Sequence, residues 1–332
     1  MKNPKYFYEL TISSSPHAHS PVTTQVVMRD VLIALLPALI GSIYFFGFRA
    51  LMVTLVSAAA CVFFEWGYRK IMKKDSTVYD LSAAVTGVLL AFVCPVTIPY
   101  WMIIIGDFFA IVIVKQLFGG IGKNFMNPAL AARAFLFSWP VAMSNWVKVG
   151  FENAAGIFST ADAVTAATPL AAMHAGSLEG VNVLDLFLGN VGGCIGETSA
   201  LLLALGGAYL VFRKVISPRI PLAFIGSVAV IALLFPQGND AFTWMLASVF
   251  SGGVMLGAIF MATDYVTSPI TKAGQIIFGI GCGVVTMVIR YFGAYNEGVS
   301  YAILVMNACV VLLDKVGRPK KFGAPKKEAA KK

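Results

Sequence analysis

The chain has 332 residues, of which 58% are hydrophobic and only 12% are charged. The core of a soluble domain cannot use so much apolar sequence, so the composition excludes a soluble enzyme and predicts an all-α, polytopic integral membrane protein. The net charge of +9 does not indicate nucleic-acid binding, because eight of the 25 lysines and arginines lie in residues 315–332 and most others lie in short loops.

The cysteines lie far apart, without a C-x-x-C pair or an adjacent pair of histidines. Metal sites and disulfide frameworks need such groupings, so we expect neither a metal site nor a disulfide. Small apolar packing is the ordinary role of isolated thiols. The residues concerned are Cys61, Cys94, Cys194, Cys282 and Cys309.

The first segment, residues 1–29, is polar and lacks the apolar core of a cleavable signal peptide. After it, apolar stretches long enough to cross a bilayer recur along the chain. We predict ten spans, five in a first membrane half (30–141) and five in a second membrane half (196–314). The spans are 30–48, 51–67, 80–95, 99–115, 126–141, 196–212, 220–235, 241–262, 275–292 and 299–314.

Lysine and arginine residues gather in alternate connections between these spans. Positive residues favour the cytoplasmic side of a membrane, so the pattern predicts that residues 1–29 and the basic tail 315–332 are both cytoplasmic. The same topology puts the one long loop, residues 142–195, on the outer face.

Two parts of the chain show a weak likeness. Residues 87–90 (GVLL) precede the VTIP stretch at 96–99, and residues 253–256 (GVML) precede the VTSP stretch at 266–269. In the predicted topology the two copies run in opposite directions, as in the inverted repeats with broken helices of many transport proteins. A solute channel or transporter is therefore one hypothesis for this chain.

Several ionisable residues fall within predicted spans or at their ends. A charge at the bilayer centre costs about 2.5–3.5 kcal/mol on insertion scales, so such residues usually face the protein interior or water. For Glu65 we expect a local pair with Arg69, one helical turn later. Asp107 could pair, be protonated or belong to an ion path. The full set is Glu65, Asp107, Arg133, Glu197 and Asp264.

A stretch rich in small residues and threonine, residues 160–173, lies in the predicted outer loop. Thr168 precedes Pro169 and an apolar run, a pattern that predicts an N-cap followed by proline at the first helical position. The surrounding sequence, from Asp162 through Thr165 to Thr168, resembles the flavin-attachment motif of a family of membrane subunits. This family comprises the D subunits of Rnf complexes and the B subunits of sodium-translocating NADH:quinone oxidoreductases.

Three further stretches resemble segments of the same family, in the same order along the chain. The resemblance therefore extends over essentially the whole sequence, and the length and short N-terminal segment resemble the D subunits more than the B subunits. The stretches are residues 123–129 with Arg133, residues 189–199, and residues 261–269.

The resemblance implies that Thr168 carries FMN through a phosphoester bond, with Thr165 and Asp162 belonging to the attachment motif. This chain has Ala166 where the family commonly has glycine, a small-for-small exchange. The family also implies a noncovalent riboflavin among the spans. Asp264, beside the second broken crossing, is placed where a cation or a second flavin would fit near the cytoplasmic side.

Four other polar residues are candidates to line a flavin site: Asn127, Arg133, Glu197 and Thr198. Arg133 could face an anionic flavin or phosphate, or form a structural pair with a carboxylate. Glu197 and Thr198 open the span that follows the loop, and an ordinary helix start explains them as well.

The resemblance implies electron transfer in an Rnf-type ferredoxin:NAD oxidoreductase that translocates Na⁺ or H⁺ across the bacterial cytoplasmic (inner) membrane. The expected partners are membrane lipid, soluble iron–sulfur and flavin subunits, a second flavinylated subunit and two membrane subunits. A separate flavin transferase would attach FMN, and we expect no nucleic-acid partner. The B subunit of the quinone reductase is the nearer alternative, and the channel or transporter is the more distant one.

Overall fold

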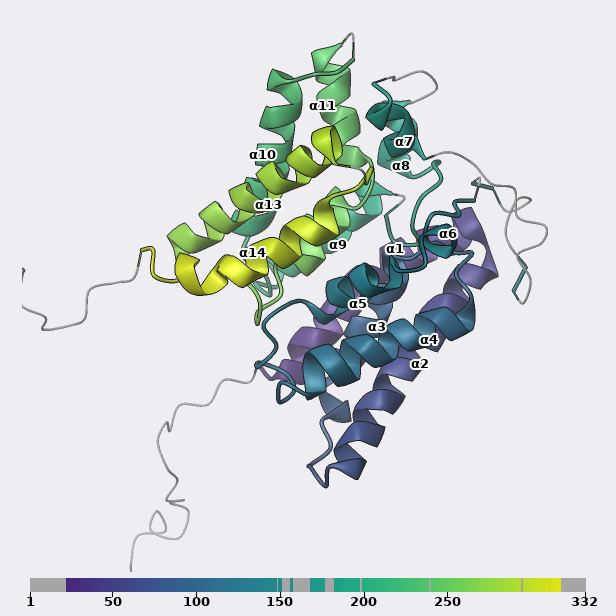
Figure 1. Cartoon of the computed structure of the whole chain (residues 1–332), viewed down its shortest axis with the longest axis vertical. Helices are drawn as coiled ribbons and strands as arrows, with labels where there is room; N and C mark the ends of the chain where they lie inside the picture. The colour runs from purple at the N-terminus through teal and green to yellow at the C-terminus, as the bar shows by residue number, and fades with distance from the viewer. Residues whose placement is uncertain are drawn as a thin grey trace, which may run out of the picture.

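The computed structural model describes residues 22–147, 149–150, 156–157, 168–176, 182–197, 199–238, 240–293 and 295–317. Within these residues the chain is helical and has no β-strand, which confirms the predicted all-α class (Figure 1).

The first half of the chain forms the lower part of Figure 1. Its first helix begins at the N-cap Thr23, whose Oγ1 accepts from Val26 N, and ends at Gly47, whose φ of 77° turns the chain into the next helix. The elements are α1 (Thr24–Phe46), α2 (Phe48–Ile71), η2 (Val78–Asp80), α3 (Ser82–Phe92), α4 (Tyr100–Phe108), η3 (Phe109–Gln116), α5 (Pro128–Leu136) and α6 (Pro140–Met143).

The second half forms the upper part of the same view, and two short helices from the predicted outer loop lie beside its α11 end. The halves meet where α1 packs against α9 and where α5 packs against α14. The elements are α7 (Pro169–His174), α8 (Val183–Leu188), α9 (Ala200–Phe212), α10 (Arg219–Leu234), α11 (Ala241–Phe250), α12 (Val254–Leu256), η5 (Gly257–Met261), α13 (Lys272–Phe292) and α14 (Val299–Leu313).

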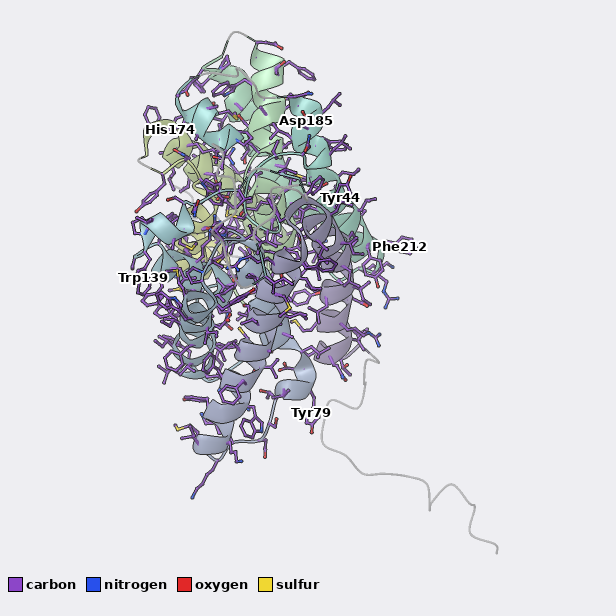
Figure 2. The ribbon with its side chains drawn as sticks, turned by 90° about the vertical axis from the view of Figure 1, so that its right-hand side faces the viewer. Tyr44, Tyr79, Trp139, His174, Asp185 and Phe212 are labelled. Carbon is purple, nitrogen blue, oxygen red and sulfur yellow. The ribbon has the colours of Figure 1, made fainter. Side chains whose placement is uncertain are left out.

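Three of the described helices, α1, α2 and α13, are long and apolar enough to cross a membrane by themselves. The pair formed by α11 and residues 254–261 passes the same test as one span bent by 60°. Large apolar side chains such as Tyr44 and Phe212 are 74% and 86% exposed on the helix surfaces, as expected for a face that contacts lipid (Figure 2). These features agree with a polytopic membrane protein.

The first predicted break is confirmed at residues 93–99, between α3 and α4. Irregular backbone is tolerated at membrane depth only where its polar groups find partners inside the protein. Here the Arg49 guanidinium donates to Val96 O at 2.8 Å and to Ile98 O at 3.1 Å. From the other side, Ile195 N donates to Cys94 O at 3.0 Å, so residues 189–199 and the break satisfy each other.

The second predicted break is confirmed at residues 262–271, between η5 and α13. Asp264 stabilises the backbone of this segment, because its carboxylate accepts hydrogen bonds from Val266 N at 3.4 Å and from the Thr267 hydroxyl at 3.1 Å. Thr271 then caps α13 by accepting from Gly274 N.

Two predicted spans are wrong in detail. The span 241–262 is interrupted at residues 251–253, where Gly252 has a φ of +65° that favours glycine. The span 126–141 consists of two short helices, α5 and α6, because α5 ends at Leu136 after nine residues. A nine-residue helix is too short to cross the hydrocarbon layer alone.

The two copies of the suspected repeat share the order helix, break, helix. They differ in one respect, because the π-helical segment follows the break in the first copy (η3) and precedes it in the second (η5). The opposite orientation of the copies stays a prediction.

Candidate functional site

Thr168 is the N-cap of α7, as its Thr-Pro sequence predicts. Its φ and ψ of −76° and 151° are extended, and its Oγ1 accepts from Ala171 N at 3.2 Å. Pro169 occupies the first helical position, where no backbone donor is required. The cap fixes the place of the hydroxyl relative to the helix.

A cavity of about 190 Å³ lies next to this hydroxyl, and we call it the threonine cavity. Thr168 lines it together with Arg133 of α5 and Glu197 of the segment before α9. Aromatic rings contribute to its wall, and those of Phe137 and Tyr295 lie 5.8 Å apart between centroids. The same cavity is thus lined by a threonine, a guanidinium, a carboxylate and aromatic rings.

Arg133 is the centre of a buried charge cluster in this wall. Its Nη2 donates to Glu297 Oε2 at 2.6 Å, and its Nη1 donates to Glu197 Oε1 at 3.3 Å and to Ser300 Oγ at 2.8 Å. The guanidinium is 3% exposed, and its Nε has no acceptor among the described residues. Both predicted roles of Arg133 therefore remain compatible, since it forms structural pairs and also lines the cavity.

Glu297, in the connection between α13 and α14, is held more firmly than Glu197. Besides Arg133, it accepts from Gly253 N at 2.7 Å through Oε1. Burial alone would raise the pKa of Glu297, but the charges of Arg133 and Arg290 and the bond from Gly253 N together lower it below its ordinary value. These contacts therefore favour the ionised form of Glu297.

Both carboxylates of the cluster approach Gly253 closely, so any side chain at this position would displace them. A Cβ on Gly253 would collide with Glu297 Oε1 and lie 2.7 Å from Glu197 Oε1. The neighbouring break in the helix therefore makes room for two acids around one arginine. Arg290 of α13 supports the same break by donating to Ser248 O at 2.6 Å and Ser251 O at 3.0 Å.

The structure brings together three of the seven site residues that the sequence predicts. Thr168, Arg133 and Glu197 all line the threonine cavity. Asn127 does not; it caps α5 by accepting from Ala129 N at 3.0 Å, and it lines a different cavity. Asp162, Thr165 and Thr198 lie outside the described residues.

Glu297 and Gly253 are functional candidates that the sequence did not single out. Glu297 stands in a short connection, where an acidic residue ordinarily faces water, and its contact with Arg133 spans 164 residues of sequence. The pair of glycines at 252–253 is the sequence feature that could have indicated this break in the helix. Glycine pairs are found in several kinds of structure, so the pair alone does not predict a break.

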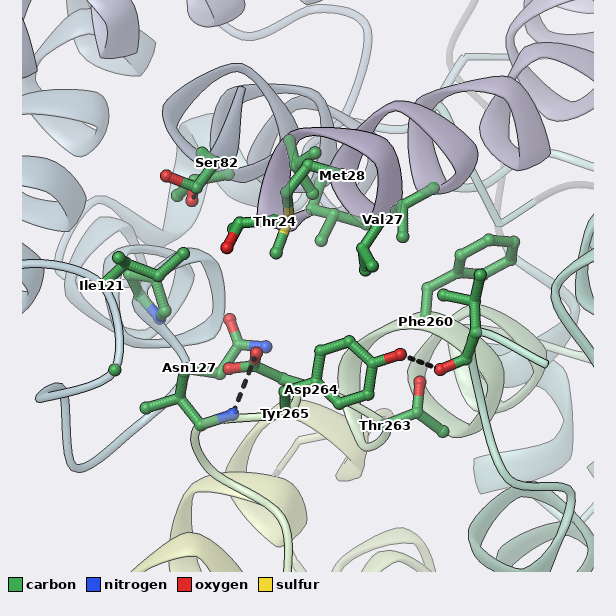
Figure 3. A pocket seen from close by; sticks show the side chains of 18 of the residues that line it. Thr24, Val27, Met28, Ser82, Ile121, Asn127, Phe260, Thr263, Asp264 and Tyr265 are labelled. Carbon is green, nitrogen blue, oxygen red and sulfur yellow. Dashed lines mark hydrogen bonds between the residues drawn. The ribbon is translucent and has the colours of Figure 1, made fainter. Parts of the chain in front are cut away.

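A second cavity of about 490 Å³ lies among the N-terminus of α1, the start of α3, the end of η3 and the 262–271 break; we call it the large cavity (Figure 3). Asp264, Asn127 and Tyr265 lie on one side of it, and Thr24 and Met28 of α1 lie across from them. Lys115 also lines it. Figure 2 places Tyr79 at the end of the molecule opposite to His174.

The expected pair of Glu65 with Arg69 is wrong. Glu65 points into the bundle, where its Oε2 contacts Lys115 Nζ at 3.0 Å and its Oε1 accepts from Gln116 Nε2 and from the Thr77 hydroxyl. Arg69 instead donates to Asp75 O at 2.7 Å.

Asp107 is buried in α4. Its Oδ1 accepts from the Ser57 hydroxyl at 2.6 Å and from the Cys61 thiol at 3.2 Å. Its Oδ2 has no hydrogen-bond partner among the described residues. No cationic side chain contacts it there, so the pairing that we considered from the sequence is not formed.

Comparison with known proteins shows the family to which the chain is similar. Residues 11–323 match the family described as the NQR2, RnfD, RnfE family. A similar protein is the D subunit of the Na⁺-translocating ferredoxin:NAD⁺ oxidoreductase complex of Acetobacterium woodii, which is 48% identical over 96% of each chain. Another is the D subunit of the proton-translocating ferredoxin:NAD⁺ oxidoreductase complex of Clostridium ljungdahlii, 43% identical over 94% of this chain and 96% of its own.

A third relative is the D subunit of the ion-translocating oxidoreductase complex of Actinobacillus succinogenes, which is 34% identical over 94% of this chain and 97% of its own. These matches span nearly the full length of this chain and of each relative. They include the helices that line both cavities. From its fold, its capped threonine and these similarities, the chain belongs to the NQR2, RnfD, RnfE family.

Proposed function

We propose that this chain is the D subunit of an Rnf-type ion-translocating ferredoxin:NAD oxidoreductase and that it relays electrons through FMN bound covalently to Thr168. The names of its relatives support the complex, since they are D subunits of ferredoxin:NAD⁺ or ion-translocating oxidoreductases. They also favour this assignment over the B subunit of a quinone reductase and over a solute channel.

The observation that carries the flavin proposal is that the Thr168 side chain lines a cavity with Arg133, Phe137 and Tyr295. The residues present fit the group. A phosphoester needs a hydroxyl, its anionic charge needs a cation with free donor capacity, and an isoalloxazine ring needs flat apolar surfaces. Bound FMN would supply the redox chemistry, while the protein would hold and tune it.

The size of the threonine cavity limits how the flavin would lie. Its 190 Å³ is below the roughly 300–1,000 Å³ of sites that engulf a drug-sized ligand. We therefore expect part of the ring to extend beyond this cavity.

A denaturing gel viewed under ultraviolet light tests the attachment. The wild-type protein, made together with the flavin transferase, should give a fluorescent band. Thr168→Asn should abolish the band without destabilising the fold, because asparagine keeps the helix cap but has no hydroxyl to esterify. Ser144→Ala, which removes another hydroxyl from the same cavity, should keep the band. A band that persists in Thr168→Asn would overturn the proposal.

The identity of the complex needs a separate assay. The purified complex should oxidise ferredoxin with NAD⁺ and should show no NADH:quinone activity. Activity with quinone alone would favour the quinone-reductase assignment instead.

We assign the noncovalent riboflavin to the large cavity. In support, the cavity is large enough for a whole ligand. Asp264, Asn127 and the threonines of its wall offer partners for the hydroxyls of a ribityl chain. Thr24→Trp should fill the entrance and reduce the riboflavin released by acid, while the covalent band stays. Gln25→Trp, the neighbouring exposed position outside this cavity, is the matched control; equal loss in both would contradict the assignment.

The topology is also a proposal: both termini cytoplasmic and Thr168 outside. A membrane-impermeant maleimide should label Ala175→Cys, next to α7, in intact cells when the half-exposed Cys309 is replaced by serine. Lys74→Cys, at the end of α2, should be labelled only after the cells are opened. The reverse result would place the loop in the cytoplasm.

A further inference from the structure

The charge cluster of the threonine cavity contains two carboxylates and a single guanidinium that contacts both. Glu297 receives two close hydrogen bonds, from Arg133 Nη2 at 2.6 Å and from Gly253 N at 2.7 Å. Glu197 accepts a longer bond from Arg133 Nη1, at 3.3 Å, through the same oxygen that faces Gly253, and a weak bond from the Cys194 thiol. The two acids are therefore unequal in how strongly their ionised forms are stabilised.

Two carboxylates that share one cation repel each other, and the less stabilised one is the first to take a proton. Arg290 contributes a second positive charge nearby, but its Nη atoms donate to the carbonyl groups of Ser248 and Ser251 rather than to either acid. With both acids ionised, the two arginines balance the two glutamates. The phosphoester proposed on Thr168 would add one negative charge, so an added electron would bring a further uncompensated negative charge.

Other titratable groups surround Glu197 on the elements that pack around it. The Cys194 thiol, on its own segment, is within 3.6 Å of Arg133 Nη2, and Cys194 and Cys94 are both buried. Neutral buried thiols cannot compensate a negative charge by taking a proton. The groups are Arg133 of α5, Arg290 of α13, Glu297, Tyr295 and Tyr301 of the α13–α14 region, and Cys94 and Cys194.

We propose that Glu197 takes up one proton when the flavin on Thr168 accepts one electron, so that this carboxylate couples electron arrival to proton uptake in the threonine cavity. The electron comes from a one-electron donor of the complex, such as an iron–sulfur centre. The proton comes from hydronium in the bulk solvent, which is left as water; an O–H bond forms on the Glu197 carboxylate, and the net charge of the cavity is unchanged. The inference rests on the proposed flavin attachment.

The pH dependence of the flavin midpoint potential in the complete complex tests this role. For one proton per electron the potential falls by about 59 mV for each tenfold fall in proton concentration. We expect this slope in the wild type and a slope near zero in Glu197→Gln, which keeps an acceptor for Arg133 but cannot ionise. Glu197→Asp should restore the slope. Asp185→Asn, on α8 and outside the cavity, should leave it unchanged.

Redox-difference infrared spectroscopy gives a second readout that does not depend on activity. Reduction of the wild type should produce the C=O band of a protonated carboxyl group, shifted in D₂O and missing in Glu197→Gln. A fluorescent Glu197→Gln protein with the wild-type slope would overturn the inference and leave the attachment intact. Absence of covalent flavin in the wild type would instead overturn the proposed function. Should Glu197→Gln fail to fold, a wild type without the carboxyl band would overturn the inference by itself.

Discussion

Lys115 and Glu65 form an ion pair of 3.0 Å in which the side chains are 3% and 1% exposed. Removing one partner of a buried pair leaves an uncompensated charge, which costs about 3–5 kcal/mol. We therefore expect Lys115→Met to lower the free energy of unfolding by this amount, measured by thermal or denaturant unfolding in detergent.

The double variant Glu65→Gln with Lys115→Met should recover most of the loss, because no isolated charge is left. The pair of Asp30 with Arg213 is a comparison in which only one partner is buried, since the Arg213 side chain is 46% exposed and the Asp30 side chain is 5% exposed. Water screens this pair more than it screens the first one, so Arg213→Met should lower the stability by less than Lys115→Met does. Equal losses of stability in Lys115→Met and Arg213→Met would contradict the expected difference between the two ion pairs.

Arg49 fixes residues 156–157, which belong to the predicted outer loop, to the first break. Besides its bonds to the break, its Nη1 donates to Gly156 O at 3.1 Å and to Ile157 O at 2.9 Å, and Tyr100 donates to Ile157 O as well. Lysine offers one nitrogen in place of a planar fork, so Arg49→Lys cannot serve all these carbonyls. We expect faster proteolysis near residue 157 in Arg49→Lys than in Arg213→Lys, with unchanged helix content. Identical cleavage rates would show that the loop is held by other contacts.

Gly87 lets α3 approach α2 closely. A Cβ at this position would lie 2.7 Å from both Ala58 Cα and Ser57 O, which are backbone atoms that cannot move aside. Gly87→Ala should therefore destabilise the protein by about 1–3 kcal/mol, as overpacking usually does. Gly226→Ala on α10, where nothing lies within 4 Å, should instead stabilise its helix by up to about 1 kcal/mol. The measurement is the melting temperature of Gly87→Ala and of Gly226→Ala, each compared with the wild type.

Asp240 caps α11 and provides a pH-dependent contribution. Hydrogen bonds from the Thr243 hydroxyl and from Phe242 N lower the pKa of Asp240 below its ordinary value. A lowered folded-state pKa means that the stabilisation is present at neutral pH and is lost as the pH falls through that value. Asp240→Asn keeps a cap that does not titrate, so acidification towards pH 3 should lower the melting temperature more in the wild type than in this variant. A parallel decline would contradict this.

Local features of the fold were predictable from the sequence, and long-range ones were not. Thr168 and Pro169 specified a helix cap, and the prolines at 95, 99 and 269 marked both breaks, because these effects act within a few residues. The pair of Glu65 with Lys115 joins positions 50 residues apart, and no local rule could favour it over Arg69.

The same difference between local and long-range features applies to the candidate site. Arg133 and Glu197 were candidates for a flavin site, and the structure places both in one cavity with Thr168, but the sequence did not reveal that Arg133 would pair with two carboxylates there. Glu297 joins them only because the chain bends at 251–253, and that bend was missed within an otherwise continuous apolar stretch. Asn127 was a candidate for a flavin site, and the structure shows it as the N-cap of α5 in the wall of the large cavity, not of the threonine cavity.

The bonds of Arg49 impose an order on biogenesis. The guanidinium can engage Gly156 and Ile157 in this way only after α2 has inserted and residues 93–99 have folded back against it. A nascent chain whose first half is misassembled would leave the stretch before Thr168 undocked. Assembly of the first half is therefore a precondition for docking residues 156–157.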